Sequence, residues 1–186
     1  MNADEVPRFY PNAVTLTATE ADQAGQLETI GILQKSNLPG RWAVKDSFNT
    51  LDLGRRGFDI LLDASWIRAV VPIGKATAGI EWRRETEAST PLPFGDDNFA
   101  MFTGRRGFGI VAGGMLYRSE GVVGLTNVVA EVADAVSVWR SLIVLAAKTF
   151  PRLPVVGYES GAELSAALDA GFELGDPLKV WVRSRD

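Results

Sequence analysis

The order of elements in the last third of the chain constrains the fold most. Residues 122–129 read VVGLTNVV, an apolar and β-branched run without alternation, which predicts a strand covered on both faces. Residues 134–150 carry apolar side chains at three- and four-residue steps, which predicts a helix with one apolar face. Residues 153–158 predict a short strand between prolines and a glycine. A strand, a helix and a strand thus follow each other closely.

A second helix and a final strand complete this segment. Ser160 is predicted as the N-cap of the helix, and Glu163, three residues later, completes a capping box. Gly171 is predicted to adopt the left-handed conformation that ends a helix. Residues 178–182 alternate between apolar and polar side chains, as a half-buried strand does. The whole segment predicts one compact half-domain with a sheet and two helices.

The first two thirds of the chain give a mixed pattern. Residues 20–35 predict a helix with apolar side chains on one face and acidic residues in its first turn. Residues 42–53 predict a second helix. The acidic and proline-rich stretch 85–97 predicts the longest loop of the chain. Strand-like runs are expected at residues 13–18, 58–62, 67–73 and 77–84, and three successive strands at 99–103, 108–117 and 122–129 indicate a meander.

The pentapeptide Gly-Arg-Arg-Gly-Phe occurs twice, at residues 54–58 and 104–108. Paired arginines in a glycine-flanked turn can grip a phosphate or a carboxylate, which makes Arg105 and Arg106 candidate phosphate-binding residues. The same sequence also suits an exposed turn whose charges are solvated, and both interpretations stay open.

Composition excludes several classes of chemistry. The 186 residues include no cysteine and no histidine, which rules out disulfides, thiolate metal sites and hydrolases with a Ser-His-Asp or Cys-His mechanism, so no metal is expected. The net charge of −4 gives no general attraction to nucleic acid. The sequence shows neither a signal peptide nor an apolar stretch that could span a membrane, so we expect a cytoplasmic protein.

Three segments together resemble the GNAT superfamily of N-acyltransferases. They are VVGLTNVV at 122–129, LPVVGYE at 153–159 and ELSAALDAGFE at 163–173, in which the turn Ala-Gly-Phe is the most family-like part. The resemblance covers about residues 99–183. It implies an α+β fold, an α/β sandwich whose mixed, mostly antiparallel twisted sheet carries helices on both faces. A single domain over 1–186 is expected, with a divergent part at 1–97 that includes the loop 85–97, and a family-like part at 98–186.

The resemblance also implies a function. A GNAT-like N-acyltransferase moves an acyl group from a thioester, acetyl-CoA or another acyl-CoA or a carrier-protein thioester, to the amine of a small molecule or a protein. The family binds the pantetheine arm through the strand that corresponds to 122–129, which implies binding by Thr126, Asn127, Val128 and Val129. The Asn127 amide can bond to the donor, or it can satisfy a bulge in its own strand.

Two residues of the next strand are candidates for proton transfer. Glu159 stands where the sheet of such folds opens, so it can receive the proton of the amine, although a solvated residue before a helix cap needs no function. Tyr158 can supply a proton to the leaving thiolate, although an aromatic ring at a sheet edge often serves packing alone.

The sequence departs from the family at the turn that binds the pyrophosphate. The family begins the helix with Arg/Gln-x-x-Gly-x-Gly/Ala, and here Asp134 stands near the arginine, Ala135 and Ser137 near glycines, and Trp139 near the last small residue. A carboxylate repels a pyrophosphate, and an indole would occupy the path of the cofactor. The acetyl-CoA site is therefore predicted to be degenerate.

A second departure concerns the general acid. The family often places a tyrosine in the last helix, and Ala167 stands nearest to that position. The two departures leave an alternative function open, a non-catalytic GNAT-fold binding or interaction module that has lost acetyl-CoA binding.

Overall fold

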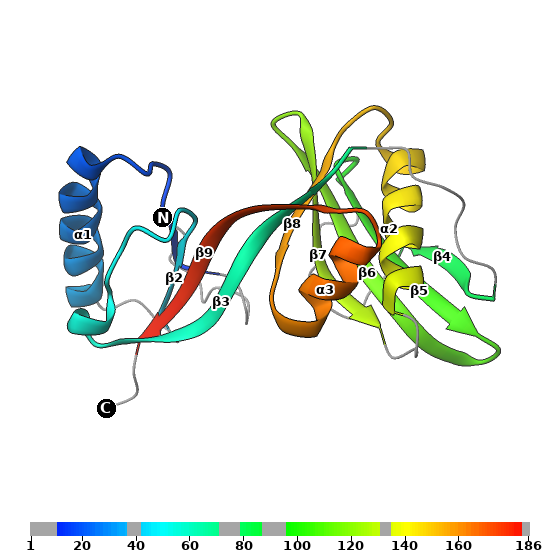
Figure 1. Ribbon diagram of the computed structural model, residues 1–186, viewed down its shortest axis with the longest axis horizontal. Coiled ribbons are helices and arrows are strands. Elements are labelled where there is room, and N and C mark those ends of the chain that lie inside the picture. Colours follow the sequence, from blue (N-terminus) through cyan, green and yellow to red (C-terminus); the bar gives the residue numbers. More distant parts are fainter. Residues whose placement is uncertain (1–10, 37–41, 71–78, 87–95, 131–134, 184–186) are drawn as a thin grey trace. The chain divides into compact units, whose positions relative to one another are not determined.

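A computed structural model describes residues 11–36, 42–70, 79–86, 96–130 and 135–183 (Figure 1). The elements are β1 (Ala13–Val14), α1 (Glu20–Lys35), β2 (Ala43–Asp46), the short 3-10 helix η1 (Gly54–Arg56), β3 (Phe58–Ala69), β4 (Glu81–Glu85), β5 (Phe99–Arg106), β6 (Gly109–Ser119), β7 (Val122–Ala130), α2 (Ala135–Thr149), β8 (Val155–Glu159), α3 (Gly161–Asp169) and β9 (Glu173–Arg183).

The sheet is mixed and mostly antiparallel, as the sequence predicted. Its strand order is β1-β2-β9-β3-β8-β7-β6-β5-β4. The pairs β1–β2 and β7–β8 are parallel, whereas β2–β9, β4–β5, β5–β6 and β6–β7 are antiparallel. The three strands β5, β6 and β7 form the expected meander.

The chain divides into two compact units. The first consists of residues 1–65 and 176–186, and the second of residues 66–175. The division falls inside β3 and inside β9, so each of these strands contributes residues to both units. The expectation of one domain with a boundary near residue 97 stays a prediction.

The core of the first unit is built around two tryptophans. The helix α1 begins and ends where the sequence predicted, with Glu20 and Asp22 in its first turn and Lys35 in its last. Leu27, Ile30 and Leu33 of this helix pack on the core. The other buried members of the cluster are Trp42, Val44, Leu51, Leu53, Phe58 and Trp181.

The core of the second unit lies under α2. This helix buries Val138, Trp139, Leu142, Ile143 and Ala146 in one cluster with side chains of β5, β6, β7 and β8. Gly114 of β6 makes room for the helix, because a Cβ atom at this position would lie 2.9 Å from Cδ2 of Leu142. The apolar helix face that the sequence predicted thus covers the meander.

The helix predicted at residues 42–53 is wrong. Residues 43–46 form β2, and Asp46 then organises a turn. Its Oδ2 accepts a hydrogen bond from the amide of Leu51 at 2.8 Å, and its carbonyl accepts one from the amide of Asn49 at 3.3 Å. Asn49 has a φ of 53°, which a helix does not allow. A buried carboxylate that bonds the backbone therefore replaces helical hydrogen bonds.

Several strand boundaries differ from the predictions, and the run 13–18 is a strand only at Ala13–Val14. The runs 58–62 and 67–73 form one strand, β3, as far as Ala69, and β9 begins at Glu173 rather than at residue 178. Residues 71–78 of the predicted strands and 87–95 of the predicted loop lie outside the described residues. Gly171 has a φ of 107°, and its amide bonds to the carbonyl of Leu168, so the predicted helix end is confirmed.

Candidate functional site

The parallel ladder between β7 and β8 is short. It pairs Val123 with Val155 and Gly124 with Val156, and the described residues of the two strands form no further pair. Gly157 follows directly, and a Cβ atom there would lie 3.0 Å from the carbonyl oxygen of Leu125. Beyond this point the edge of β7 that faces β8 has main-chain groups that this ladder does not use.

A β-bulge interrupts β7 after the ladder ends. Met115 pairs with Thr126 and Gly113 with Val129, so two steps along β6 correspond to three along β7. Asn127 occupies the irregular position with a φ of 52°, and its Nδ2 donates to Sδ of Met115 at 3.1 Å. This contact fits the structural alternative for Asn127, in which the amide serves the bulge.

The bulge decides which predicted donor-binding residues are accessible. The side chains of Thr126, Asn127 and Val129 are exposed. Val128 packs against the core of the second unit instead. An extended ligand at this site would therefore bond mainly to the main chain of residues 126–129 and less to their side chains.

The two candidates for proton transfer are consecutive residues of β8. Side chains of consecutive strand residues point to opposite faces of the sheet, so Tyr158 and Glu159 do not act on the same face. The ring of Tyr158 contacts Trp66 edge to face, with 5.5 Å between the ring centroids. Glu159 ends the strand and is half-buried.

Burial and a neighbouring charge change the acidity of Glu159. Burial, which disfavours the charged carboxylate, and to a smaller extent the negative charge of Glu163 raise the pKa of Glu159 to about 7. A carboxyl group with this pKa is ionised in a large fraction of molecules at neutral pH and binds a proton readily. It therefore has the acidity of a general base.

Glu163 holds a second, unexpected contact. Its Oε2 accepts a hydrogen bond from Nε1 of Trp139 at 3.2 Å. The Trp139 side chain is 1% exposed, and its ring meets Phe172 edge to face at 5.4 Å. The helices α2 and α3 are thereby linked, and they lie side by side in Figure 1.

This contact corrects two predictions. The capping box is wrong, because Ser160 makes no side-chain bond at the start of α3 and the Glu163 carboxylate bonds to an indole. Trp139 does not stand in an open cofactor path, because its ring belongs to the core. Residues 131–134, which include Asp134, lie outside the described residues, so the degenerate phosphate turn stays a prediction.

Sequence reasoning also missed the role of Glu163 as a charge beside Glu159. The spacing of four residues between the two glutamates was a usable signal, because it spans the end of β8 and the first turn of α3. The capping interpretation concealed this signal, since it gave Glu163 a sufficient structural purpose.

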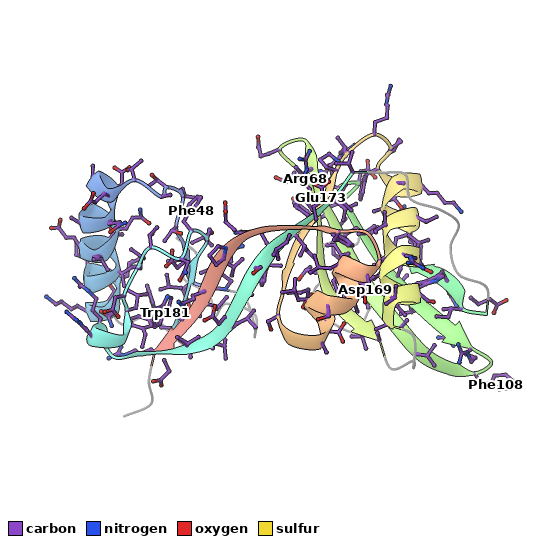
Figure 2. All side chains as sticks on the ribbon, viewed as in Figure 1. Phe48, Arg68, Phe108, Asp169, Glu173 and Trp181 are labelled. Carbon is purple, nitrogen blue, oxygen red and sulfur yellow. The ribbon has the colours of Figure 1, made fainter. Side chains whose placement is uncertain are left out.

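The predicted phosphate-binding arginines lie at the hairpin between β5 and β6. Arg105 and Arg106 line a hollow of about 250 Å³ together with Glu81. In the register of the strands β4 and β5, Glu81 stands opposite Arg105. The Nε atom of Arg105 is buried and has no hydrogen-bond partner among the residues that the structure describes. Phe108 projects fully exposed from the tip of this hairpin (Figure 2).

These arginines are separate from Glu159. The strands β6 and β7 lie between β5 and β8 in the sheet, a separation of roughly 14 Å at the usual strand spacing. In the other copy of the pentapeptide, Arg55 pairs with Asp52 at 3.3 Å and Nη1 of Arg56 donates to the carbonyl of Leu27 at 3.2 Å. That copy therefore serves local structure.

Within the described ranges, no three His, Cys, Asp or Glu side chains gather as ligands of a metal ion. None of the described helices combines the length and the apolar character that a membrane crossing requires.

Sequence comparisons find no relative. No protein-family model matches the chain, and the search of curated proteins gives no match.

Solved structures resemble the chain over most of its length. A functionally unknown conserved protein from Staphylococcus epidermidis has a TM-score of 0.62 at 10% identity, over 93% of this chain and 84% of that one. A GCN5-related N-acetyltransferase from Kribbella flavida has a TM-score of 0.54 at 10% identity, over 88% and 74%. A GCN5-related N-acetyltransferase-like protein from Streptococcus suis has a TM-score of 0.52 at 11% identity, over 86% and 76%. With its mixed sheet and the short β7–β8 ladder, the chain has the fold of the GCN5-related N-acetyltransferases, the GNAT fold.

Proposed function

We propose that the chain is an N-acyltransferase in which Glu159 accepts the proton of the attacking amine. One observation carries this proposal. Glu159 lies at the end of β8, just past the point where the β7–β8 ladder stops, and its pKa is raised to about 7. A titratable group with a perturbed pKa at an opening of the sheet is a candidate for acid–base chemistry.

The main chain of β7 is the proposed binding surface for the donor. A pantetheine arm is extended and carries two amide groups, so it can bond to a strand edge as another strand does. The edge of residues 125–130 beyond the ladder offers such groups, and the exposed side chains of Thr126 and Val129 flank it. The donor is the thioester of CoA or of a carrier protein.

The reaction transfers one acyl group and one proton. The amine nitrogen attacks the carbonyl carbon of the thioester, the C–N bond forms, and the C–S bond breaks. The proton of the amine goes to the Glu159 carboxylate, and the leaving thiolate takes a proton from water. The hydroxide ion that remains takes the proton from Glu159, which returns to the ionised form. We assign this second role to water because Tyr158 packs against Trp66 and points to the other face of the sheet.

The test measures thiol release from acetyl-CoA and from longer acyl-CoAs, with a panel of primary amines. With an active amine, the rate is expected to rise with pH and level off above a midpoint near 7, because Glu159 must be ionised to accept a proton. Glu159→Gln is expected to lower the rate about a hundredfold or more, the usual contribution of a general base. An unchanged rate in this variant would disprove the assignment.

Two further variants separate chemistry from structure. Glu163→Gln removes the neighbouring charge, so the midpoint of the pH profile is expected to move down while the rate at high pH is kept. Glu173→Gln, at an exposed position of the same unit, is the control and should leave both the midpoint and the rate unchanged.

A non-catalytic binding module is the second candidate. Two of the predicted donor-binding residues favour this candidate, because their side chains have structural contacts instead. Asn127 donates a hydrogen bond to Met115, and Val128 packs on the core. A ligand that binds only the folded state raises its melting temperature. If millimolar acyl-CoA gives neither a thermal shift nor thiol release, the CoA-dependent transferase is excluded and the binding module is the better account.

A further inference from the structure

The first unit contains a pocket that belongs to no part of the β7–β8 site. Its volume is about 530 Å³, which falls in the range of small-molecule sites. The wall consists of β1, the residues that follow it, one side of α1 and one residue of β2. The lining residues are Ala13, Val14, Thr15, Leu16, Thr17, Ala21, Asp22, Gly25, Gln26, Thr29, Ile30, Leu33 and Val44.

Most of this lining is apolar, and part of it is exposed to water. The side chain of Leu16 is 87% exposed and that of Val14 is 43% exposed, whereas Ile30 and Val44 are buried. An apolar ligand body in the pocket would cover the exposed side chains and so gain hydrophobic free energy.

Asp22 is the single charged residue among the described residues of the lining. Its Oδ2 accepts hydrogen bonds from the hydroxyl groups of Thr17, at 3.0 Å, and of Thr19. Its Oδ1 has no hydrogen-bond or ion-pair partner among the described residues. The bonds from Thr19 and then Thr17 lower the pKa of Asp22, so the carboxylate stays charged at neutral pH. The pocket therefore combines an apolar wall with one fixed negative charge.

Gly25 opens the pocket on the side of the helix. It lies inside α1, where glycine is less favourable than alanine. A Cβ atom at this position would meet no atom within 4 Å, so packing does not require a glycine there. The missing side chain instead leaves space in the pocket wall.

Gln26 keeps the two walls together. Its Nε2 donates to the main-chain carbonyl of Thr17 at 3.1 Å, which ties the segment after β1 to the helix. The pocket is therefore formed before any ligand binds, and a ligand does not have to order the wall.

We propose that this pocket binds a primary ammonium compound with an apolar body, whose cation pairs with Asp22. An acyl-CoA is a poor candidate for this pocket, because its phosphates would meet the carboxylate of Asp22 and no lining cation. The inference does not depend on the proposed acyl transfer, since the lining residues all belong to the first unit.

The test uses three small probes that differ in one group, phenethylamine, phenethyl alcohol and phenylacetate. Titrations of the full chain, followed by NMR chemical shifts of the first unit, measure each affinity. The amine is expected to bind best, the alcohol more weakly and phenylacetate least. Equal affinity for the amine and phenylacetate, or no binding of any probe, would overturn the proposal.

Variants then locate the binding. Asp22→Asn is expected to weaken the amine about threefold, as for a solvent-exposed ion pair, and to leave the alcohol unchanged. Glu28→Gln is the matched control, because Glu28 is an exposed acid of the same helix outside the pocket lining, and it should change neither affinity.

Gly25→Leu tests the space itself. Its side chain is expected to fill the pocket and to abolish the shifts caused by the amine and the alcohol. Circular dichroism and the melting temperature show that the variant is folded. Unchanged binding in a folded Gly25→Leu protein would place the probes elsewhere and reject the pocket.

Discussion

The buried tryptophans of the two units differ in their hydrogen bonds. In the second unit, the Nε1 atom of Trp139 donates to Glu163, whereas the buried Nε1 atom of Trp82 has no hydrogen-bond partner in the described structure. In the first unit, the Nε1 atoms of Trp42 and Trp181 are buried, and neither has a hydrogen-bond partner in the described structure. An unsatisfied buried donor costs about 1–3 kcal/mol. Among the described residues, the first unit has four buried side-chain atoms without a hydrogen-bond partner and the second unit has two, Trp82 Nε1 and Arg105 Nε. The first unit is thus expected to open at a lower free energy than the second, which hydrogen exchange can resolve.

The largest expected effect comes from removing one core leucine in each unit. Leu142→Ala in the second unit and Leu53→Ala in the first each empty a fully buried position, and each should lower the free energy of unfolding by about 3 kcal/mol. Urea denaturation measures this loss.

Amide hydrogen exchange then shows whether the two units open separately. Leu53→Ala should lower protection in α1 and β2 while α2 keeps it, and Leu142→Ala should lower protection in α2. Equal loss throughout the chain in both variants would mean that the units open as one.

A glycine beside the proposed site gives the next effect. Gly157→Ala places a Cβ atom 3.0 Å from the main-chain carbonyl of Leu125, which cannot rotate away as a side chain can. The expected destabilisation is about 2 kcal/mol, typical of overpacking. Thermal or urea unfolding measures it. A loss below the experimental error would show that β7 and β8 move apart without cost.

The pH dependence of stability tests the carboxyl group of Glu159. Its pKa in the folded state is about 7, above the ordinary value of 4.5, so between these pH values the folded state holds a proton that the unfolded chain has lost. The stabilisation is complete below pH 4.5 and is lost as the pH rises through 7.

Glu159→Gln should remove this dependence. Relative to the variant, the wild-type protein is expected to lose about 1 kcal/mol between pH 5 and pH 8, after allowance for solvent screening. Unfolding free energies of both proteins across this range measure the difference. Parallel curves for the two proteins would mean that Glu159 titrates normally.

The smallest effect has the opposite sign. Gly25→Ala in α1 meets no atom within 4 Å and improves helix propensity, so it should raise the free energy of unfolding by about 0.5–1 kcal/mol. Gly25→Ala and Gly157→Ala together compare a glycine of the first unit with free space at its Cβ position and a glycine of the second unit with a close main-chain atom there. A destabilising Gly25→Ala would show that the pocket wall is tighter than the structure describes.

Sequence patterns predicted the fold where local and tertiary preferences agree. The helix at 20–35 was placed to the residue, and the meander and α2 were placed within a few residues. In α2, apolar periodicity and burial coincide. At 42–53 the apolar pattern suited a helix, but the carboxylate of Asp46 bonds the backbone and forms a turn. Such a buried polar contact has no periodic signature.

The candidate site was less accessible to sequence reasoning. Glu159 could be named from the family resemblance, but its raised pKa depends on burial and on Glu163, which only the three-dimensional structure brings together. The sequence left a bulge at Asn127 as one of two alternatives, because the position of a bulge depends on the register with β6. The pocket beside Gly25 has no sequence pattern that predicts it, since part of its space is due to the absence of a side chain at Gly25.

The division of the chain also sets an order in which it can fold during synthesis. The second unit is continuous in sequence, residues 66–175, whereas the first unit consists of two segments that stand on either side of it. The first unit needs residues 176–186, which carry Trp181 into its core. Residues 1–65 can therefore complete their core only after residues 176–186 have been synthesised, and deletion of residues 176–186 is expected to unfold the first unit.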